Sequence, residues 1–204
     1  MKIICIGRNY HAHISELNNK IPDEPVFFMK PDSSLLRKND PLFLPGWTKE
    51  MHHEIELVIK ICRLGKNIEK RFASRYYKEI GLGIDFTARD IQKELKAKGL
   101  PWEKAKAFDG SAALGSSFIS VDSFPDRNNI NFSLNINGIQ VQKGTSELMI
   151  FSFEDIISYV SQFMTLKTGD LIYTGTPAGV GPVNIGDHLE GYLEEIKLLD
   201  LKIK

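Results

Sequence analysis

Hydrophobic and polar residues alternate most regularly between residues 54 and 61, in the run EIELVIKI. Every second residue from 55 to 61 is aliphatic, whereas positions of the other parity hold Glu54, Glu56 and Lys60 as well as one valine. Alternation with a period of two is typical of a β-strand, whose successive side chains point to opposite faces. The pattern therefore predicts a strand over 54–61 that presents Glu54 and Glu56 on the same face.

Further strands are predicted from short apolar runs and from a second alternating stretch. The stretch INFSLNINGIQVQKG alternates on both sides of Asn137–Gly138, a dipeptide that favours a tight hairpin turn. Residues 187–204 alternate again. The predicted short strands are Lys2–Ile6, Val26–Met29, Gly81–Phe86 and Asp170–Gly175.

Helical periodicity is clearest in Phe153–Met164, where apolar residues recur on one face. A second amphipathic helix begins at Thr87 or Ala88 and is closed by Gly99 and Pro101. Residues 67–80 have helical character, and residues 10–17 suggest a short helix or structured loop. Residues 32–47 suggest a loop with brief extended pieces, and the small residues of 105–115 suggest a loop or backbone near a ligand. This order of elements predicts a β-rich α+β fold with a large mixed or antiparallel sheet.

The 204 residues contain no repeat and no convincing linker, which predicts a single domain spanning residues 1–204. Lysine plus arginine equals aspartate plus glutamate, at 26 each, so no net charge attracts nucleic acid or an anionic membrane, although a local patch could. The two cysteines form no disulfide framework, which fits a reducing cytoplasm. The first residues do not resemble a signal peptide, and no apolar run approaches the roughly 20 residues of a membrane helix.

Three acidic residues define the first candidate site. Asp85 ends the apolar segment LGLGID, where a solvated carboxylate is less natural, and Glu54 and Glu56 share a strand face. Three inward-facing carboxylates would repel one another unless a cation joined them, and oxygen ligands without thiolate are typical of Mg²⁺, Mn²⁺ or Ca²⁺. The alternative is the solvated face of an edge strand. His52 and His53, which precede the pair, could orient a carboxylate or could lie in a solvated loop.

Other residues have the chemistry of a base and of an anion site. His13 and Glu16 would share a helix face, so that the carboxylate could raise the basicity of the imidazole; a chance surface pair is the alternative. Lys106 could be a cation for a substrate or an enolate, or a solvated lysine. The loop TGTPAGVGP lacks the spacing of a nucleotide-binding loop, but its N–H groups and the hydroxyls of Thr174 and Thr176 could bind a small carboxylate; a tight structural turn is the alternative.

The order and wording of these segments resemble the fumarylacetoacetate hydrolase family, and most closely its small acylpyruvase and oxaloacetate decarboxylase branch. The resemblance implies a catalytic domain without the extra N-terminal domain of the larger hydrolases. It implies a mixed β-roll or sandwich with peripheral helices, usually dimeric. The segments that carry it cover nearly the whole chain in order: IGRNYHAHISEL, PVFFMKP, HHEIELVIKI, GIDFTARDIQ, KGLPWEKAKAFDG, NINGIQVQKG, SELMIFSFEDIISYVS and GDLIYTGTPAGVGP.

The resemblance also implies roles for individual residues. Glu54, Glu56 and Asp85 match the three acidic ligands of a Mg²⁺ ion, for which Mn²⁺ is a possible substitute. His13 and Glu16 match a water-activating dyad on a segment that closes over substrate. The metal and the base are thus assigned to separate parts of the chain.

Further residues are assigned to the substrate by the same resemblance. Lys106 matches the lysine beside the metal, and Thr176 lies in the loop that binds the substrate carboxylate. Four more residues stand in segments that line the pocket of the family: Arg8, Lys30, Arg89 and Gln92.

Together these features predict a cytoplasmic, metal-dependent enzyme, expected to be a homodimer, that cleaves a carbon–carbon bond in a small 2-oxo acid. The reaction would be hydrolysis of an acylpyruvate, decarboxylation of oxaloacetate, or both. One alternative is an isomerase, hydratase or decarboxylase of unsaturated 2-oxo diacids in aromatic catabolism. Another is an inert protein that binds a metal or a metabolite. We expect neither nucleic acid nor a membrane as a partner.

Overall fold

The strands form three sheets in the computed structural model, which describes residues 1–17, 20–36 and 39–204. The largest sheet runs, in spatial order, through β2 (Val26–Lys30), β1 (Ile3–Gly7), β12 (Leu171–Tyr173), β5 (Ile55–Ile61), β6 (Tyr77–Asp85), β8 (Ala112–Leu114) and β3 (Leu35–Leu36), with β9 (Ile119–Ser120) paired to β6. This sheet is mixed, because β1 and β12 are parallel, as are β3 and β8, whereas its other pairs are antiparallel.

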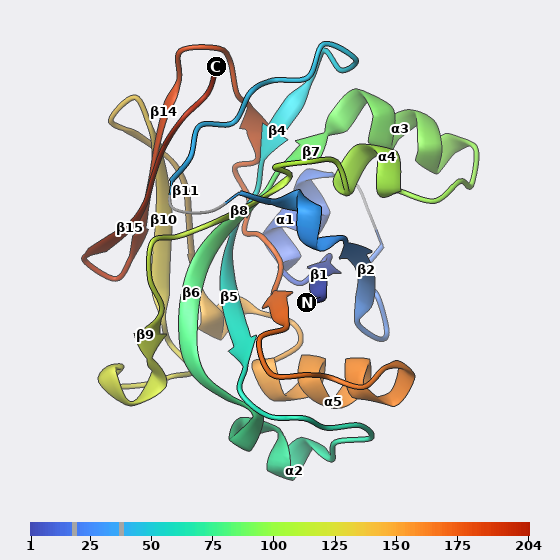
Figure 1. The fold of residues 1–204 in the computed structure, drawn as a ribbon, viewed down its shortest axis with the longest axis vertical. Helices are drawn as coiled ribbons and strands as arrows, with labels where there is room; N and C mark the ends of the chain where they lie inside the picture. Colours follow the sequence, from blue (N-terminus) through green and yellow to red (C-terminus); the bar gives the residue numbers. More distant parts are fainter. Residues whose placement is uncertain (18–19, 37–38) are drawn as a thin grey trace.

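Two smaller sheets complete the strand content. The four-stranded sheet has the order β11 (Ile139–Thr145), β10 (Asn131–Ile136), β14 (His188–Leu193) and β15 (Ile196–Lys202), and the three-stranded sheet has the order β13 (Gly181–Pro182), β4 (Met51–His53) and β7 (Thr87–Ala88). Asn137 and Gly138 join β10 to β11 with φ angles of 53° and 80°, which confirms the predicted hairpin. The four-stranded sheet stands along one side of the curved β5 and β6 strands (Figure 1).

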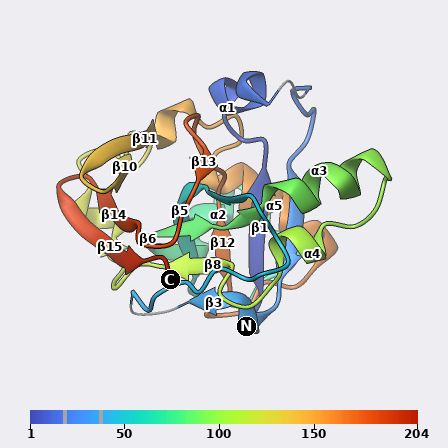
Figure 2. The same ribbon diagram turned by 90° about the horizontal axis from the view of Figure 1, so that it is seen from above.

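Five α-helices accompany the sheets: α1 (His11–Glu16), α2 (Lys70–Ala73), α3 (Arg89–Ala97), α4 (Glu103–Lys106) and α5 (Phe153–Phe163), as counted over the described residues. Short 3₁₀ turns cover Asp32–Ser34, Ser74–Tyr76, Val121–Ser123 and Ser146–Leu148. Helices α3 and α4 lie at one end of the molecule and α2 and α5 at the other (Figure 1), while α1 and α3 lie at its outer edge when it is seen from above (Figure 2). The predicted β-rich α+β fold with peripheral helices is confirmed.

Strand β5 is a central strand between β12 and β6, and side chains on both of its faces are buried in hydrophobic clusters. Its odd-numbered residues, from Ile55 to Ile61, have no exposed surface and pack in the main core together with residues of the four-stranded sheet such as Leu134. Burying one such aliphatic side chain contributes about 1.5–3 kcal/mol. Val58, of the other parity, packs on the opposite side with Cys5. Glu56 shares the parity of Val58, so the alternative of a solvated edge strand is wrong.

Two predicted elements differ from the structure. Within residues 67–80, only Lys70–Ala73 and Ser74–Tyr76 are helical, and β6 begins already at Tyr77. Tyr77 and Ile80 pair with β5, so burial in the sheet overrides the local helical tendency. The small-residue segment 105–115, expected to be a loop, contains the end of α4 and strand β8.

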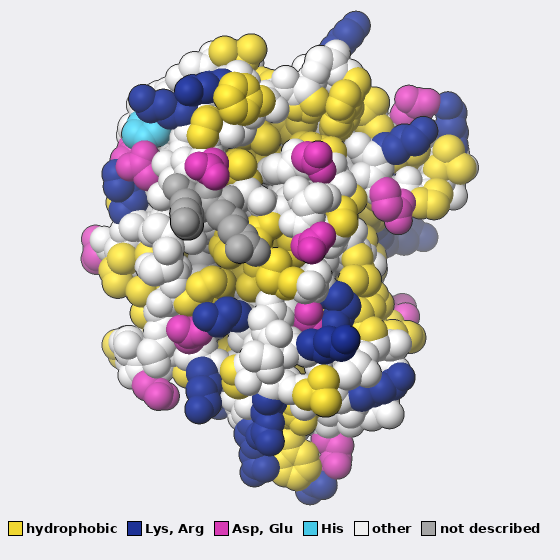
Figure 3. All heavy atoms as spheres, in the orientation of Figure 1, with side chains coloured by type: hydrophobic (Ala, Val, Ile, Leu, Met, Phe, Trp, Pro, Cys, Tyr) yellow, Lys and Arg dark blue, Asp and Glu magenta, His cyan; other side chains and the backbone are white. Residues whose placement is uncertain are grey.

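The surface carries a local basic region although the chain has no net charge. Lysine and arginine side chains gather over the end of the molecule where α2 lies (Figure 3), and Lys70, Arg71 and Arg75 belong to this segment. Lys70 and Arg71 form ion pairs with Asp155 and Glu69, which offset part of this charge. Among the helices of the described residues, none is long and apolar enough to cross a membrane.

Candidate active site

Three carboxylates converge at the end of the β5–β6 pair. Glu54 immediately precedes β5, Glu56 lies on β5, and Asp85 ends β6. The N–H of Asp85 donates to the carbonyl oxygen of Glu54 at 2.9 Å, which sets the register that brings the two strands' acids together. Each residue offers a carboxylate oxygen, and these ligand atoms all lie within 4.8 Å of one another. The three residues are 5%, 1% and 1% exposed, so water cannot screen their repulsion.

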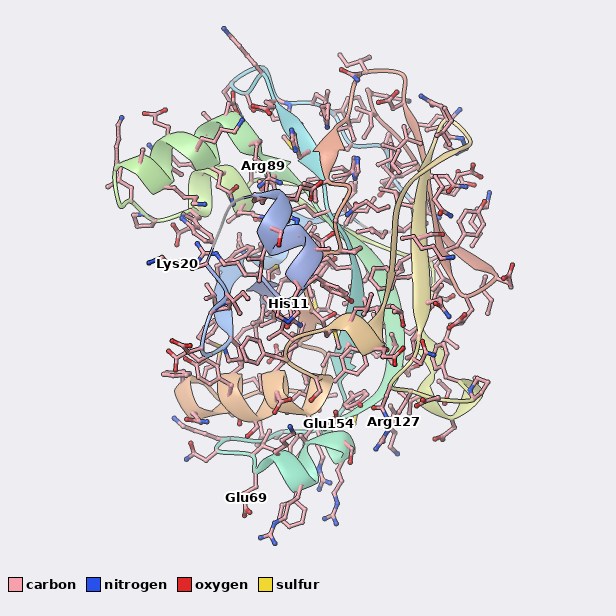
Figure 4. All side chains as sticks on the ribbon, turned by 180° about the vertical axis from the view of Figure 1, so that it is seen from behind. His11, Lys20, Glu69, Arg89, Arg127 and Glu154 are labelled. Carbon is pink, nitrogen blue, oxygen red and sulfur yellow. The ribbon has the colours of Figure 1, made fainter. Side chains whose placement is uncertain are left out.

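Three cations pair with this group of acids: Lys30, Arg89 and Lys106. Lys106 Nζ donates to Glu54 Oε2 at 2.9 Å and to Asp85 Oδ2 at 2.7 Å. Arg89, the first residue of α3, pairs through Nη2 with Glu54 Oε1, and Figure 4 shows it at the start of that helix. The charges of Glu54 and Asp85 are therefore paired within the protein.

Glu56 differs from the other two acids because no lysine or arginine among the described residues pairs with it. Its Oε2 accepts one hydrogen bond, from the N–H of Gly175 at 2.8 Å. Burial and the charges of Asp85 and Glu54 raise the pKa of Glu56 well above its ordinary value. By contrast, Lys106 and Arg89 outweigh burial at Glu54 and hold its pKa well below the ordinary value.

The group fits a hard divalent cation on two observations. Its donor set consists of carboxylate oxygens, the ligands that Mg²⁺ and Mn²⁺ prefer. Asp85 Oδ1 accepts no aligned hydrogen bond even though Lys30 Nζ lies 2.7 Å away, and the charge of Glu56 has no cationic partner in the described chain. A cation between these oxygens would relieve both deficits.

The structure changes the prediction for Lys30. Its side chain is completely buried, and its Nζ donates to the carbonyl oxygen of Ser111 at 2.8 Å besides pairing with Asp85. Lys30 is absent from the residues that line the cavity next to the carboxylates. It therefore holds Asp85 from behind and is not placed to contact a substrate. Lys106, in contrast, is both paired with the acids and part of the cavity wall.

The cavity brings together most of the residues predicted from the sequence. The predicted residues on its wall are Arg8, His13, Glu54, Glu56, Asp85, Arg89, Gln92, Lys106 and Thr176. The sequence reasoning missed six more: Ile6, Gly7, Leu17, Phe28, Lys96 and Trp102. Of these, Lys96 belongs to the amphipathic pattern of α3, and the others had no local signal that separates them from core residues.

His13 and Glu16 form a pair on α1 at the mouth of this cavity. His13 Nδ1 lies 3.3 Å from Glu16 Oε2, so Nε2 is the ring nitrogen left to act as a base. His13 is 6% exposed and lines the cavity, whereas Glu16 lies behind it. Glu16 also accepts hydrogen bonds from the N–H of Gly179, at 3.1 Å to Oε1 and 3.3 Å to Oε2. The pair is thus a structured contact, which argues against a chance surface pair.

The loop after β12 approaches the carboxylates through its backbone. Gly175 has a φ of 102°, a left-handed conformation that favours glycine, and an added Cβ would lie 2.7 Å from the Cβ of Asn9. This conformation directs the Gly175 N–H to Glu56. The side chain of Asn9 holds the same loop by donating to the carbonyl oxygen of Thr174 at 2.8 Å. The close approach of the backbone explains the glycine in the sequence TGTP.

Both threonine hydroxyls of this loop are committed to the protein. Thr174 Oγ1 donates to the carbonyl oxygen of Leu57 at 2.9 Å, and Thr176 Oγ1 donates to that of Ile55 at 2.8 Å. A hydroxyl has one proton, so neither can also donate to a substrate carboxylate. Anion binding by this loop therefore stays a prediction that concerns its N–H groups and not these hydroxyls. The N–H of Thr176 donates to no described residue, and Thr176 lines the cavity.

Gln142 of β11 is a buried residue that the sequence reasoning missed. Its Nε2 donates to Thr176 Oγ1 at 2.9 Å, and its Oε1 accepts from the N–H of Ile55 at 3.0 Å. The same Oε1 lies 2.8 Å from His53 Nδ1. Gln142 thereby links the four-stranded sheet to the strand that carries Glu56. Its sequence position gave no signal, because these partners lie far along the chain.

The two histidines before the acidic pair lie on β4, not in a solvated loop. His53 is 2% exposed, and burial lowers its pKa. His52 Nδ1 accepts from Arg89 Nε at 3.4 Å, and His52 Nε2 lies 3.1 Å from Glu50. His52 therefore supports Arg89, which in turn pairs with Glu54. Its link to the acids is indirect.

Comparison with known sequences identifies the family. The sequence profile described as "Fumarylacetoacetate (FAA) hydrolase C-terminal" matches residues 2–203. The chain belongs to the fumarylacetoacetate hydrolase family. The resemblance seen in the sequence is thus confirmed, and with it the family's fold.

Two relatives in the fumarylacetoacetate hydrolase family are named for different reactions of oxaloacetate. The chain is 40% identical over 202 residues to "Oxaloacetate tautomerase FAHD1, mitochondrial" of Bos taurus, covering 99% of this chain and 91% of that protein. It is 45% identical over 186 residues to "Oxaloacetate decarboxylase, mitochondrial" of Dictyostelium discoideum, covering 91% of this chain and 85% of that protein. Enzymatic processing of small 2-oxo acids is what these family members share.

Solved structures of the family superpose closely on this fold. A fumarylacetoacetate hydrolase family protein from Yersinia pestis has a TM-score of 0.95 at 40% identity, covering 100% of this chain and 93% of that one. A fumarylpyruvate hydrolase from Pseudomonas aeruginosa, in complex with Mn²⁺ and pyruvate, has a TM-score of 0.93 at 33% identity, covering 100% of this chain and 89% of that one. A family member of the same fold therefore binds a divalent metal ion and a 2-oxo acid.

Proposed function

We propose that this protein is a Mg²⁺- or Mn²⁺-dependent enzyme that cleaves a carbon–carbon bond in a small 2-oxo acid, by decarboxylating oxaloacetate or hydrolysing an acylpyruvate. The observation that carries the proposal is the buried group Glu54, Glu56 and Asp85, in which Glu56 has no cationic partner among the described residues. The base His13 lines the same cavity. The names of the relatives and the Mn²⁺–pyruvate complex of the family support the same class of substrate.

The three carboxylates would hold the cation, and the other residues would act on the substrate. When bound, the cation supplies a Lewis acid for the 2-oxo group and its neighbouring carboxylate. Two of the three N–H donors of Lys106 form hydrogen bonds with Glu54 and Asp85. The third donor remains to stabilise negative charge on an enolate oxygen. The N–H of Thr176 is available to donate to the substrate carboxylate.

His13 supplies the proton transfer. In hydrolysis, its Nε2 would take a proton from water as the water attacks the distal carbonyl of an acylpyruvate. Glu16 holds the other ring nitrogen and stabilises the protonated imidazole. Decarboxylation breaks the bond to a carboxylate and needs no attacking water, so it depends less on His13 and more on stabilisation of the enolate.

A second reaction, keto–enol tautomerisation of oxaloacetate, is favoured by the name of the Bos taurus relative, which matches 99% of this chain. Tautomerisation moves one proton between carbon and oxygen of the same substrate. His13 Nε2 is the base placed on the cavity wall for that transfer. Tautomerisation would form the enolate of oxaloacetate and decarboxylation the enolate of pyruvate, so one site that stabilises an enolate could serve both.

The test is a set of turnover assays on the purified protein. Acetylpyruvate cleavage, oxaloacetate decarboxylation and the decay of enol-oxaloacetate are each measured with Mg²⁺, with Mn²⁺ and with EDTA. We expect turnover that requires the metal. Glu54→Ala should abolish every activity, whereas His13→Ala should reduce hydrolysis severely and decarboxylation much less.

Two outcomes would contradict the proposal. Full activity of Glu54→Ala in magnesium-depleted buffer would show that the metal assignment is wrong. Absence of turnover of all three substrates by a protein that binds Mn²⁺ tightly would favour a different unsaturated 2-oxo diacid or an inert binding protein. The expected homodimer and cytoplasmic location stay predictions, and the Bos taurus and Dictyostelium relatives are themselves named mitochondrial.

A further inference from the structure

Helix α3 presents a polar stripe to the cavity. Arg89, Gln92 and Lys96 all line the wall, and their spacing of three and four residues places them on one face of the helix. Arg89 pairs with Glu54 at the metal end of the stripe. Lys96 lies seven residues further along, about 10 Å at the usual helical rise. The stripe therefore leads from the proposed metal site to the far part of the cavity.

Lys96 ends this stripe, and it lines the same cavity as Arg8. Side chains on an α-helix tilt toward its N-terminus, so the side chain of Lys96 belongs to the same face as Gln92. Burial, together with the charges of Arg8 and Arg89, lowers the pKa of Lys96. Because Arg8 and Lys96 line one cavity, two positive charges border the same space. Like charges held together across a cavity are typical of an anion site.

Arg8 is held in an uncommon backbone conformation at this place. Its φ is 59°, in the left-handed region that few residues other than glycine adopt. The next residue, Asn9, anchors the turn by donating to the carbonyl oxygens of Phe151 at 3.0 Å and Thr174 at 2.8 Å. Strain of this kind persists where the surroundings fix it, and it is found often at ligand sites.

The balance of charge around the cavity also favours an anion site near Arg8. Close to the metal site, the three carboxylates are matched by three cations, Lys30, Arg89 and Lys106. In the described chain the guanidinium of Arg8 forms no ion pair, although it lines the cavity. The charge of Arg8 is additional to these three matched pairs of charges, so it favours a ligand with a second negative group.

We propose that Arg8 and Lys96 form a subsite for the second carboxylate of a 2-oxo diacid. This inference rests on the proposed function for the position of the first carboxylate. The subsite would make the enzyme select dianionic substrates, with a carboxylate at the end of a short chain, over acylpyruvates whose distal group is neutral.

The experiment compares two unreactive four-carbon ligands. Malate and 2-hydroxybutyrate share the 2-hydroxy acid end, but only malate has a second carboxylate. Their dissociation constants are measured by calorimetry with the Mn²⁺-loaded wild type, with Lys96→Met and with Lys98→Met. Lys98 follows the last residue of α3, is exposed and is not part of the cavity wall, so its replacement controls for the loss of one positive charge.

The wild type should bind malate more tightly than 2-hydroxybutyrate. Lys96→Met should weaken malate binding about tenfold, the usual effect of losing one charge-assisted hydrogen bond, and leave 2-hydroxybutyrate unchanged. Lys98→Met should alter neither ligand. Equal loss for both ligands in Lys96→Met, or equal binding of both by the wild type, would overturn the subsite.

The same data separate this inference from the proposed reaction. A wild type that turns over acetylpyruvate or oxaloacetate but binds malate and 2-hydroxybutyrate equally would contradict the subsite alone. A wild type without turnover that still prefers malate, and loses this preference in Lys96→Met, would support the subsite and contradict the reaction.

Discussion

Two clusters of possible metal ligands lie in the described part of this molecule, one buried and one partly exposed. Glu54, Glu56 and Asp85 are buried at the end of the β5–β6 pair. A second cluster, which we call the surface cluster, consists of His188, Glu190 and Asp200 on the β14–β15 hairpin, with side chains 36%, 20% and 42% exposed. In both clusters the ligand atoms lie within 4.8 Å of one another. Geometry alone therefore does not distinguish them.

The difference between them is how their charge is satisfied. In the surface cluster, Lys197 Nζ lies 3.1 Å from Glu190 and 2.7 Å from Asp200, and solvent screens what remains. Two like charges 4 Å apart interact by about 1 kcal/mol in bulk water but by about 4 kcal/mol at the effective dielectric of about 20 that also describes buried protein sites. The buried group is held against this larger repulsion, and Glu56 has no cationic side chain beside it in the described chain. Burial, more than ligand identity, marks the functional site.

The largest expected difference in activity is between variants of two glutamates, Glu56 of the buried group and Glu190 of the surface cluster. Glu56→Gln should lower metal-dependent turnover on the order of 1000-fold, because the electrostatic stabilisation of the enolate is lost, and should weaken Mn²⁺ binding. Glu190→Gln should change neither. Calorimetric titration with Mn²⁺ and turnover assays measure both variants. Tight Mn²⁺ binding by Glu56→Gln would place the metal elsewhere.

The second comparison concerns matched lysines. Lys106→Met leaves Glu54 and Asp85 with one cation fewer in a buried place, so we expect a loss of about 3 kcal/mol in the free energy of unfolding of the metal-free protein. Lys197→Met, at a solvent-exposed ion pair, should change the free energy of unfolding much less than Lys106→Met does, because solvent screens the pair. Urea unfolding in EDTA measures both. Equal losses would contradict the contrast between buried and exposed charge.

The third comparison concerns matched histidines. His13→Gln should reduce acylpyruvate hydrolysis about 100-fold, because the general base is lost, while Mn²⁺ affinity stays unchanged. His188→Gln should leave hydrolysis unchanged. The assay is hydrolysis at saturating Mn²⁺ with a parallel binding titration. Loss of Mn²⁺ binding in His13→Gln would show that His13 supports the metal instead of acting as the base.

The smallest effect is expected from the surface cluster itself. Hydrogen bonds from His188 and Lys197 lower the pKa of Asp200 below its ordinary value of 3.8. The stabilisation by ionised Asp200 is therefore present above pH 3.8 and is lost as the pH falls through the lower pKa of the folded state. Asp200→Asn should cost less than about 1 kcal/mol at pH 7, because the pair is exposed.

Thermal unfolding of Asp200→Asn and wild type at pH 7 and at pH 3 measures this effect. The gap between their melting temperatures should shrink at pH 3, and it should also shrink at pH 7 in high salt. A gap that widens on acidification would mean that Asp200 acts through contacts other than this ion pair.

The local sequence patterns predicted where strands occur better than they predicted which face of a strand is buried or lines the cavity. The period of two placed Glu54 and Glu56 on one face of a strand, but only pairing with β6 and β12 shows that this face is buried. Lys30 illustrates the same limit. It ends a correctly predicted strand, yet its side chain lies behind Asp85 and not in the cavity. Which face of a strand meets a cavity depends on elements distant in the sequence.

Long-range hydrogen bonds account for the other residues that were missed or misread. Gln142 contacts His53 and Thr176 from another sheet, and nothing in its local alternation differs from that of its neighbours. The committed hydroxyl of Thr176 could not be predicted either, because its acceptor is a carbonyl oxygen of β5. By contrast, His13 and Glu16 are neighbours on one short helix, so their pairing followed from the sequence alone.

Glu16 contacts both His13 and the loop that carries Gly179, so it links the two. The same carboxylate that steadies His13 is itself held by the N–H of Gly179, in the loop that follows Thr176. If that loop shifts, the imidazole loses its fixed orientation, and proton transfer slows before any bond of the substrate is touched. The orientation of the proposed base is therefore coupled to the position of the loop that carries Gly179.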